Sequence, residues 1–266
     1  SEECFEEDET ELKNEVFKKL AWQRPSVETI TEDYEKTNPN NSHPRVLCNQ
    51  TQWEGLKKVA KREKILASMM ENFPKGGDLV LEYDLPEYIL TSSGKLLNVS
   101  REVLNIAERL AMQYRLTGDK RYAEKAWDVL ERVCNFPDWN NNHWLDTAEM
   151  AAAVSIMFDW CYDAFTKEQR SFVVETLKNY CLLPAAEVYS FPKGVRGNNN
   201  GGWVYAMSNW SAVCNGGVAM AAIAVMGEGD EETEQLAAEC IAGGLKSVEN
   251  MLVGFGYDGA WVEGPY

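Results

Sequence analysis

The pattern of hydrophobic and polar positions predicts helices along most of the chain. From residue 50 onward, apolar residues recur at the three- and four-residue spacing of a helix, and no segment shows strand-like alternation of useful length. The predicted helices cover residues 51–73, 100–116, 120–133, 146–165, 166–183, 208–226 and 231–252. Turn and cap residues separate them: Thr117-Gly118-Asp119 joins a C-cap glycine to a new N-cap, and Thr166 to Gln169 is a capping box.

The predicted helices differ in how their apolar residues are distributed. Residues 146–165 and 208–226 are apolar on nearly every face, whereas neighbouring helices are amphipathic. A helix that is apolar all round is buried on all sides. We therefore predict an all-α fold class, an incomplete (α/α) toroid in which helical hairpins place one helix inside and one outside. A plain helical bundle is the alternative.

The net charge of the chain limits the classes of partner that it is expected to bind. The 266 residues carry 26 Lys+Arg against 42 Asp+Glu, a net charge of −16. This balance argues against nucleic acid as a partner, because phosphate binding requires a basic face. A membrane partner is not expected either, since no run of about 18 apolar residues is free of polar groups. Acidic residues crowd the start, so we expect an acidic arm and linker over residues 1–45 and one domain over residues 46–266.

Cysteines and histidines indicate that the chain holds no metal or cofactor. The seven cysteines form no CxxC pair, and most lie in apolar helical stretches, where a free thiol acts as a small hydrophobe. His43 and His143 are the only histidines, too few for a His-rich metal site. Free cysteines and the absence of a visible signal peptide slightly favour the cytoplasm, while a secreted or periplasmic location stays open if a signal was removed.

One long loop and several polar residues on apolar helices are candidates for binding. The loop from Phe191 to Trp203 combines amides with Arg196 and an aromatic ring, which suits a sugar chain; a plain surface loop is the alternative. Asn215 and Glu149 lie on apolar helices and must be hydrogen-bonded or face a cavity, and a structural hydrogen bond is favoured for Glu149. Asn209 stands at a helix start, where an N-cap role is the alternative.

Four segments, in this order, resemble the N-terminal half of the heparinase II/III-like polysaccharide lyases, a family that includes oligoalginate lyases. The segments are His43-Pro44-Arg45-Val46-Leu47, Leu145-Asp146-Thr147-Ala148-Glu149-Met150-Ala151, Asn209-Trp210-Ser211-Ala212-Val213-Cys214-Asn215-Gly216-Gly217 and Asp258-Gly259-Ala260-Trp261-Val262-Glu263-Gly264-Pro265. The resemblance implies an incomplete toroid followed by a C-terminal β-sandwich domain that supplies a catalytic histidine. This chain lacks that domain, which would be its partner in the full-length protein, so we expect this part alone to be inactive.

The resemblance also implies the chemistry, which is β-elimination at a uronic acid in an acidic oligo- or polysaccharide. The reaction needs a group that neutralises the substrate carboxylate, a base that takes the C5 proton and an acid that protonates the leaving O4. Asn209 matches the family position that contacts the carboxylate. Tyr266, 57 residues later (266 − 209), matches the proton-transferring tyrosine, and Tyr257 is the weaker candidate. The residues expected to bind substrate are Trp210, Trp203, Arg196, Asn215, Glu149 and Tyr257.

The acidic body favours an unsulfated or weakly sulfated uronate polymer, because a heparin cleft would need many cations. Two other functions stay open. The chain can be a glycan-binding toroid without catalysis, or a glycoside hydrolase that works with two carboxylates. The carboxylates available to a hydrolase are Asp146, Glu149, Asp258 and Glu263, for which structural roles are favoured.

Overall fold

A computed structural model describes residues 23–190, 201–256 and 259–261. Helices make up most of these residues and no strand is among them. An isolated bridge joins Phe255 to Trp261, so the predicted all-α class is confirmed. The α-helices are α2 (Val27–Thr37), α3 (Gln50–Ala60), α4 (Lys64–Asn72), α5 (Leu97–Thr117), α6 (Lys120–Cys134), α7 (Trp144–Trp160), α8 (Lys167–Leu177), α9 (Leu183–Ser190), α10 (Asn209–Val225) and α11 (Glu231–Leu252). The 3-10 or π segments are η1 (Phe73–Glu82), η2 (Asn141–His143), η3 (Tyr162–Ala164), η4 (Lys178–Leu182) and η5 (Gly201–Tyr205).

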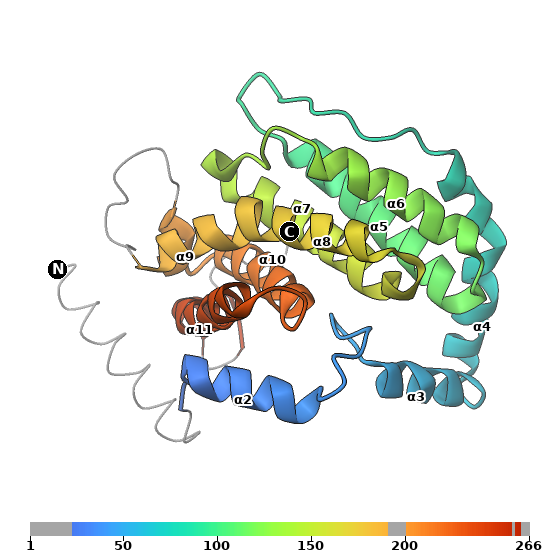
Figure 1. Cartoon of the computed structure of the whole chain (residues 1–266), viewed down its shortest axis with the longest axis horizontal. Helices are drawn as coiled ribbons and strands as arrows, with labels where there is room; N and C mark the ends of the chain where they lie inside the picture. The colour runs from blue at the N-terminus through green and yellow to red at the C-terminus, as the bar shows by residue number, and fades with distance from the viewer. Residues whose placement is uncertain (1–22, 191–200, 257–258, 262–266) are drawn as a thin grey trace.

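Helix α7 lies at the centre of the fold. It packs against α5 on one side and α10 on the other, while α6 packs on α5, α11 on α10, and α2 on α11 (Figure 1). Every residue of α7 is buried except Glu149 and Ala152. The prediction that an all-round apolar helix is buried is therefore confirmed for α7.

Helix α10 departs from the same prediction. Its sides toward α7 and α11 are buried, but Ala212 and Gly216 are exposed. Alanine and glycine count as apolar in the sequence pattern but have little apolar surface, so exposing them to solvent costs little free energy. Because Asn209, Ala212 and Gly216 recur at helical spacing, the open side of α10 is also the side that carries Asn209.

The backbones of α7 and α10 come unusually close. A Cβ atom added at Gly217 would lie 2.2 Å from the carbonyl oxygen of Ala148. No side chain fits into that space, so glycine at this position lets the two helices touch. The contact fixes the separation of α7 and α10 near their N-terminal halves.

The predicted helix over residues 51–73 is wrong as a single element. The structure breaks it at residues 61–63, where the N–H groups of Arg62 and Glu63 both donate to the carbonyl of Val59. Helix α3 then buries Trp53, while α4 has no buried residue. The break falls in a polar run without glycine or proline, so no local signal marked it.

The described part of the N-terminal segment is bound tightly to the domain. Helix α2 packs along α11, and Arg24 forms an ion pair with Glu249 at 2.9 Å. Further on, the ring of His43 stacks on that of Tyr162 at 3.6 Å between centroids. Residues 23–45, predicted as arm and linker, therefore contribute contacts to the fold.

A buried polar network holds this segment at the C-terminal end of α7. His43 Nδ1 lies 2.6 Å from Asp159 Oδ1, and its Nε2 lies 3.1 Å from Glu228 Oε1. Asp159 Oδ2 accepts hydrogen bonds from the backbone N–H groups of Arg45 and Val46, both at 2.8 Å. All three side chains of the His43–Asp159–Glu228 set are nearly inaccessible to solvent. The network therefore joins three distant parts of the sequence.

Candidate functional site

The N-terminal end of α7 carries a second histidine–aspartate pair. His143 Nδ1 lies 2.5 Å from Asp146 Oδ1, one turn further along the chain. The chain enters α7 through η2, after Asn140 in the left-handed conformation (φ 58°). This local geometry places His143 directly before the helix, with Asp146 in its first turn.

Asp146 is held rigidly. Its Oδ2 accepts hydrogen bonds from the backbone N–H of Leu96 at 2.5 Å and from the Asn140 side-chain amide at 2.7 Å, and its side chain is fully buried. Because these donors fix the carboxylate, they also fix the imidazole of His143, whose side chain is 12% exposed. Because Asp146 occupies the Nδ1 side of the ring, Nε2 is the nitrogen left for a ligand.

Helix α10 begins beside this pair. The rings of Trp210 and His143 meet edge to face, with centroids 5.0 Å apart at 85°. Asn209 is the first residue of α10 and is partly buried. The N-cap is Ser208, which forms no side-chain cap hydrogen bond, so the alternative N-cap role for Asn209 is excluded. The positive end of the α10 dipole thus lies next to an amide, an indole and an imidazole.

Trp203 lies at the same end of the domain but is buried. Its ring is 2% exposed and packs between Trp144 and Tyr189, at centroid distances of 5.1 and 5.4 Å. A ring that stacks on a sugar must present a face to solvent. In this arrangement Trp203 packs against Trp144, the residue that follows His143, and has a structural role.

Asn215 is paired entirely within the protein. Its Nδ2 donates to the carbonyl of Ser211 and to Ser247 Oγ, both at 2.8 Å, and its Oδ1 accepts from the Tyr189 hydroxyl at 2.8 Å. Of the two alternatives for this buried amide, the structure therefore shows the paired one. Asn215 links α10 to α9 and α11.

Glu149 forms an ion pair with Arg101 of α5. The Arg101 Nε lies 3.1 Å from Glu149 Oε2, with the arginine side chain 59% exposed and the glutamate 12%. Burial, reinforced by the charge of Glu149, raises the pKa of the nearby Cys214 thiol. That thiol is therefore protonated at neutral pH and is not a nucleophile. The described cysteines are all free.

Three of the sequence-predicted site residues, Arg196, Tyr257 and Tyr266, lie outside the described residues, as do Asp258 and Glu263. The structure brings Asn209, Trp210, Trp203 and Glu149 to the N-terminal ends of α7 and α10. Of the carboxylates available to a hydrolase, Asp146 and Glu149 are occupied by protein donors.

Sequence reasoning missed His143. The local signal was present, because His143 and Asp146 have the three-residue spacing that lets side chains meet across one helical turn. The contact with Trp210 had no local signal, since it joins residues that are far apart in the chain.

A scan of the sequence against protein-family models found no match, and a search of curated proteins found none that is similar. Within the described ranges, no helix has the length and apolar character required to cross a lipid bilayer. In the same part of the chain, no three His, Cys, Asp or Glu side chains gather in a way that would hold a metal ion.

Proposed function

We propose that this chain is the toroid part of a polysaccharide lyase, which cleaves a uronic-acid-containing glycan by β-elimination. One observation carries the proposal: Asn209 and Trp210, which begin α10, lie beside the His143–Asp146 pair that begins α7. The resemblance places the carboxylate contact at Asn209. The structural neighbourhood adds groups suited to that task.

The arrangement of helices agrees with a toroid. Helices α5, α7 and α10 pack side by side. Each is followed in the sequence by a helix that packs against it: α6 follows α5, α8 follows α7, and α11 follows α10. In a toroid the ends of the inner helices meet at one mouth. The candidate groups of α7 and α10 stand at the N-terminal ends, where the helix dipoles are positive and favour an anionic substrate.

Each step of the elimination has a proposed residue. The Asn209 amide and the N-terminus of α10 bind the uronate carboxylate, which makes the C5 proton more acidic. His143, with Nδ1 held by Asp146, offers Nε2 as a second partner for the carboxylate or the proton. Tyr266 transfers protons at C5 or O4. The C4–O4 bond breaks and a C4=C5 double bond forms.

The open side of α10 gives a polymer room to approach. A side chain added at Gly216 would meet no atom within 4 Å, and Ala212 is exposed on the same side. Ala212 and Gly216 thus leave the side of α10 that follows Asn209 without bulky side chains. We propose that a glycan chain approaches the start of α10 along this side.

The decisive experiment is an activity assay on the full-length native protein with alginate, polygalacturonate, hyaluronan and heparin. A lyase releases an unsaturated product that absorbs in the ultraviolet. We expect product from an unsulfated uronate polymer. New reducing ends without ultraviolet absorbance would identify a hydrolase, and binding without cleavage would identify a glycan-binding module; either result overturns the proposal.

Variants then test the residues. Asn209→Ala should lose roughly 10²–10³ in kcat, comparable with the loss of an oxyanion-hole donor. Tyr266→Phe removes only the hydroxyl and should reduce kcat far more than it changes KM. The matched controls are Asn179→Ala and Tyr83→Phe, two exposed positions, which should keep wild-type kinetics. Wild-type turnover in Tyr266→Phe would move the role to Tyr257 or a later tyrosine.

A further inference from the structure

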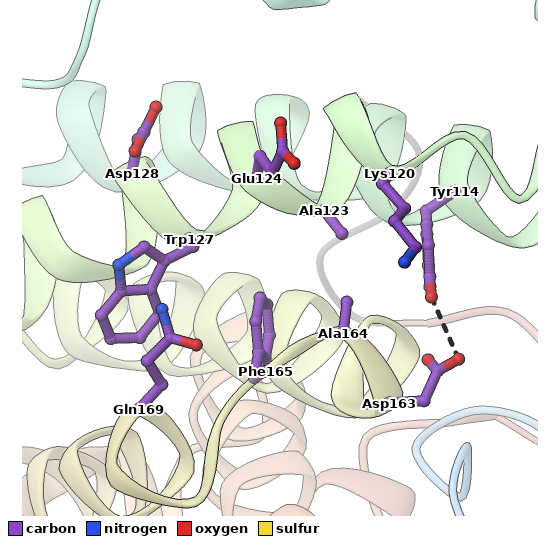
Figure 2. A pocket seen from close by; sticks show the side chains of 10 residues that line it. All are labelled: Tyr114, Lys120, Ala123, Glu124, Trp127, Asp128, Asp163, Ala164, Phe165 and Gln169. Atoms are coloured by element: carbon purple, nitrogen blue, oxygen red, sulfur yellow. Dashed lines mark hydrogen bonds between the residues drawn. The ribbon is translucent and has the colours of Figure 1, made fainter.

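A cavity of about 510 Å³ lies at the other end of the helical layer. It opens between α6 and the segment from η3 to the start of α8, beside the last turns of α5 (Figure 2). Helix α7 is 17 residues long and spans about 25 Å at 1.5 Å per residue, which separates this cavity from the candidate lyase site. The cavity is therefore a separate place in the fold from the site at Asn209.

Two aromatic rings form one wall of the cavity. Trp127 of α6 is half-buried, and its ring lies 5.9 Å from Phe165 and 6.3 Å from Phe172, measured between centroids. Phe165 is buried, so it holds the indole in place and contributes an apolar floor. Figure 2 shows Trp127 and Phe165 between α6 and the opposite segment.

The charges around these rings are mostly negative. Glu124 and Asp128, four residues apart on α6, and Asp163 on the opposite side all line the cavity. Of the described residues that line it, Lys120 is the only cation. Asp163 accepts a hydrogen bond from the Tyr114 hydroxyl at 3.0 Å, whereas Glu124 and Asp128 are exposed and form no ion pair with a described residue. Their carboxylates are available to an external ligand.

We propose that this cavity binds an organic cation of the quaternary ammonium type. The charged head lies against the indole of Trp127, near Glu124 and Asp128, and the apolar part of the ligand lies over Phe165. An aromatic face attracts a cation through its quadrupole, and nearby carboxylates add to the attraction. A sugar acid would be repelled by the same carboxylates, so the cavity is not an extension of a uronate site.

The test uses choline as the probe and two matched compounds. The first is its neutral isostere, in which a tert-butyl group replaces the trimethylammonium group, and the second is glucuronate. Titration calorimetry and saturation-transfer NMR measure the binding of each to the whole protein. We expect choline to bind about 3- to 30-fold more tightly than the isostere, the ratio typical of a cation on an aromatic face, and glucuronate not to bind at the cavity.

Variants place the binding in the cavity. The double variant Glu124→Gln with Asp128→Asn changes only exposed side chains, so the protein stays folded. We expect its affinity for choline to fall and its affinity for the neutral isostere to stay unchanged. Glu131→Gln, one turn further along α6 and outside the cavity, is the matched control and should behave as wild type. Trp127→Leu should reduce the preference for choline. Absence of choline binding, equal binding of the isostere, or unchanged binding in the double variant would overturn the proposal.

Discussion

The two ends of α7 carry the same pair of side chains in opposite surroundings. At the C-terminal end, Asp159 pairs with His43 at 2.6 Å, and the imidazole has a carboxylate on each nitrogen. At the N-terminal end, Asp146 pairs with His143 at 2.5 Å, but Nε2 has no hydrogen bond to a described residue. The first pair is closed by protein on all sides, and the second keeps one nitrogen for a ligand.

The comparison shows that a histidine–aspartate pair does not by itself define a function. What differs is the occupancy of the second nitrogen and the neighbours. Glu228 and the stacked ring of Tyr162 complete the closed pair. An indole edge and a helix start flank the open one. We therefore assign stability to the pair at Asp159 and ligand contact to the pair at His143.

The largest effect is expected from Asp159→Ala. The change leaves His43 and the backbone N–H groups of Arg45 and Val46 without their acceptor in a buried site, which costs about 3–5 kcal/mol of unfolding free energy. Urea denaturation followed by circular dichroism measures the loss. Asp33→Ala, at an exposed position of α2, is the control and should change little. A loss below 1 kcal/mol in Asp159→Ala, set against the range just cited, would contradict the assigned role.

His43→Ala and His143→Ala compare the two pairs directly. We expect about 2–3 kcal/mol of destabilisation for His43→Ala, which removes one hydrogen bond from each of two buried carboxylates at once; Asp159 keeps its two backbone donors, and Glu228 keeps Asn41 and Tyr162. For His143→Ala we expect about 1 kcal/mol, since Asp146 keeps its two other donors. The order reverses for turnover of a uronate polymer, where His143→Ala should be the more damaging change. If the two variants lose the same unfolding free energy and the same turnover, the two histidine–aspartate pairs do not have different roles.

The pH dependence of stability reports on the closed network. Burial acts to raise the pKa of Glu228, but hydrogen bonds from His43 and Tyr162, with the nearby charges of His43 and Arg45, outweigh it and hold that pKa below 4.5. The contribution of Glu228 is therefore present above pH 4.5 and is lost as the pH falls through the lower folded value.

The same network should also weaken in alkali. Burial and the hydrogen bond to Glu228 raise the pKa of Tyr162 from 10.0 to about 12, so its contribution is intact below pH 10 and is lost as the pH rises toward 12. Urea midpoints measured across pH should show both losses. In Glu228→Gln the acid-side loss should become shallower, and an unchanged profile would show that other groups control it.

The smallest effect is expected from Arg101→Met. The Arg101–Glu149 ion pair joins α5 to α7 near the open end, but the arginine side chain is 59% exposed. Exposed pairs contribute between about 0 and 1 kcal/mol, so we expect less than about 0.5 kcal/mol of change in unfolding free energy. A larger loss, measured in the same urea assay, would make Glu149 a central structural residue of this end.

Local signals in the sequence were sufficient for much of the helical framework. The capping box at Thr166 and the left-handed glycine at Gly118, φ 71°, are both present as predicted. Helix α11 has its predicted bounds, because Asp230 caps a long, strongly periodic segment. The segment after Thr166 was harder: α8 ends at Leu177, and the chain continues through a π turn into α9, where Pro184 lies in the first turn. Proline lacks the N–H of a continuous helix, so it marks a helix boundary in the sequence, but here the chain remains helical on both sides of it.

The candidate site was only partly predictable. Its members Asn209 and Trp210 were chosen from the sequence, but their neighbour His143 depends on how α7 and α10 pack. Trp203, in contrast, was chosen from the sequence as a substrate-binding residue, but its side chain is buried. An aromatic residue after a glycine-rich loop is a reasonable sugar platform, and whether its ring is buried depends on Trp144 and Tyr189, which the local sequence does not determine.

The contact between Gly217 and Ala148 determines which insertions the candidate site tolerates. It anchors α10 to α7 eight residues after Asn209. One residue inserted between positions 209 and 217 would turn the start of α10 by about 100° relative to that anchor and move Asn209 and Trp210 away from His143. The same insertion after Gly217 would leave their alignment intact. We therefore expect a residue inserted between positions 209 and 217 to be more damaging to the candidate site than one inserted between Gly217 and α11.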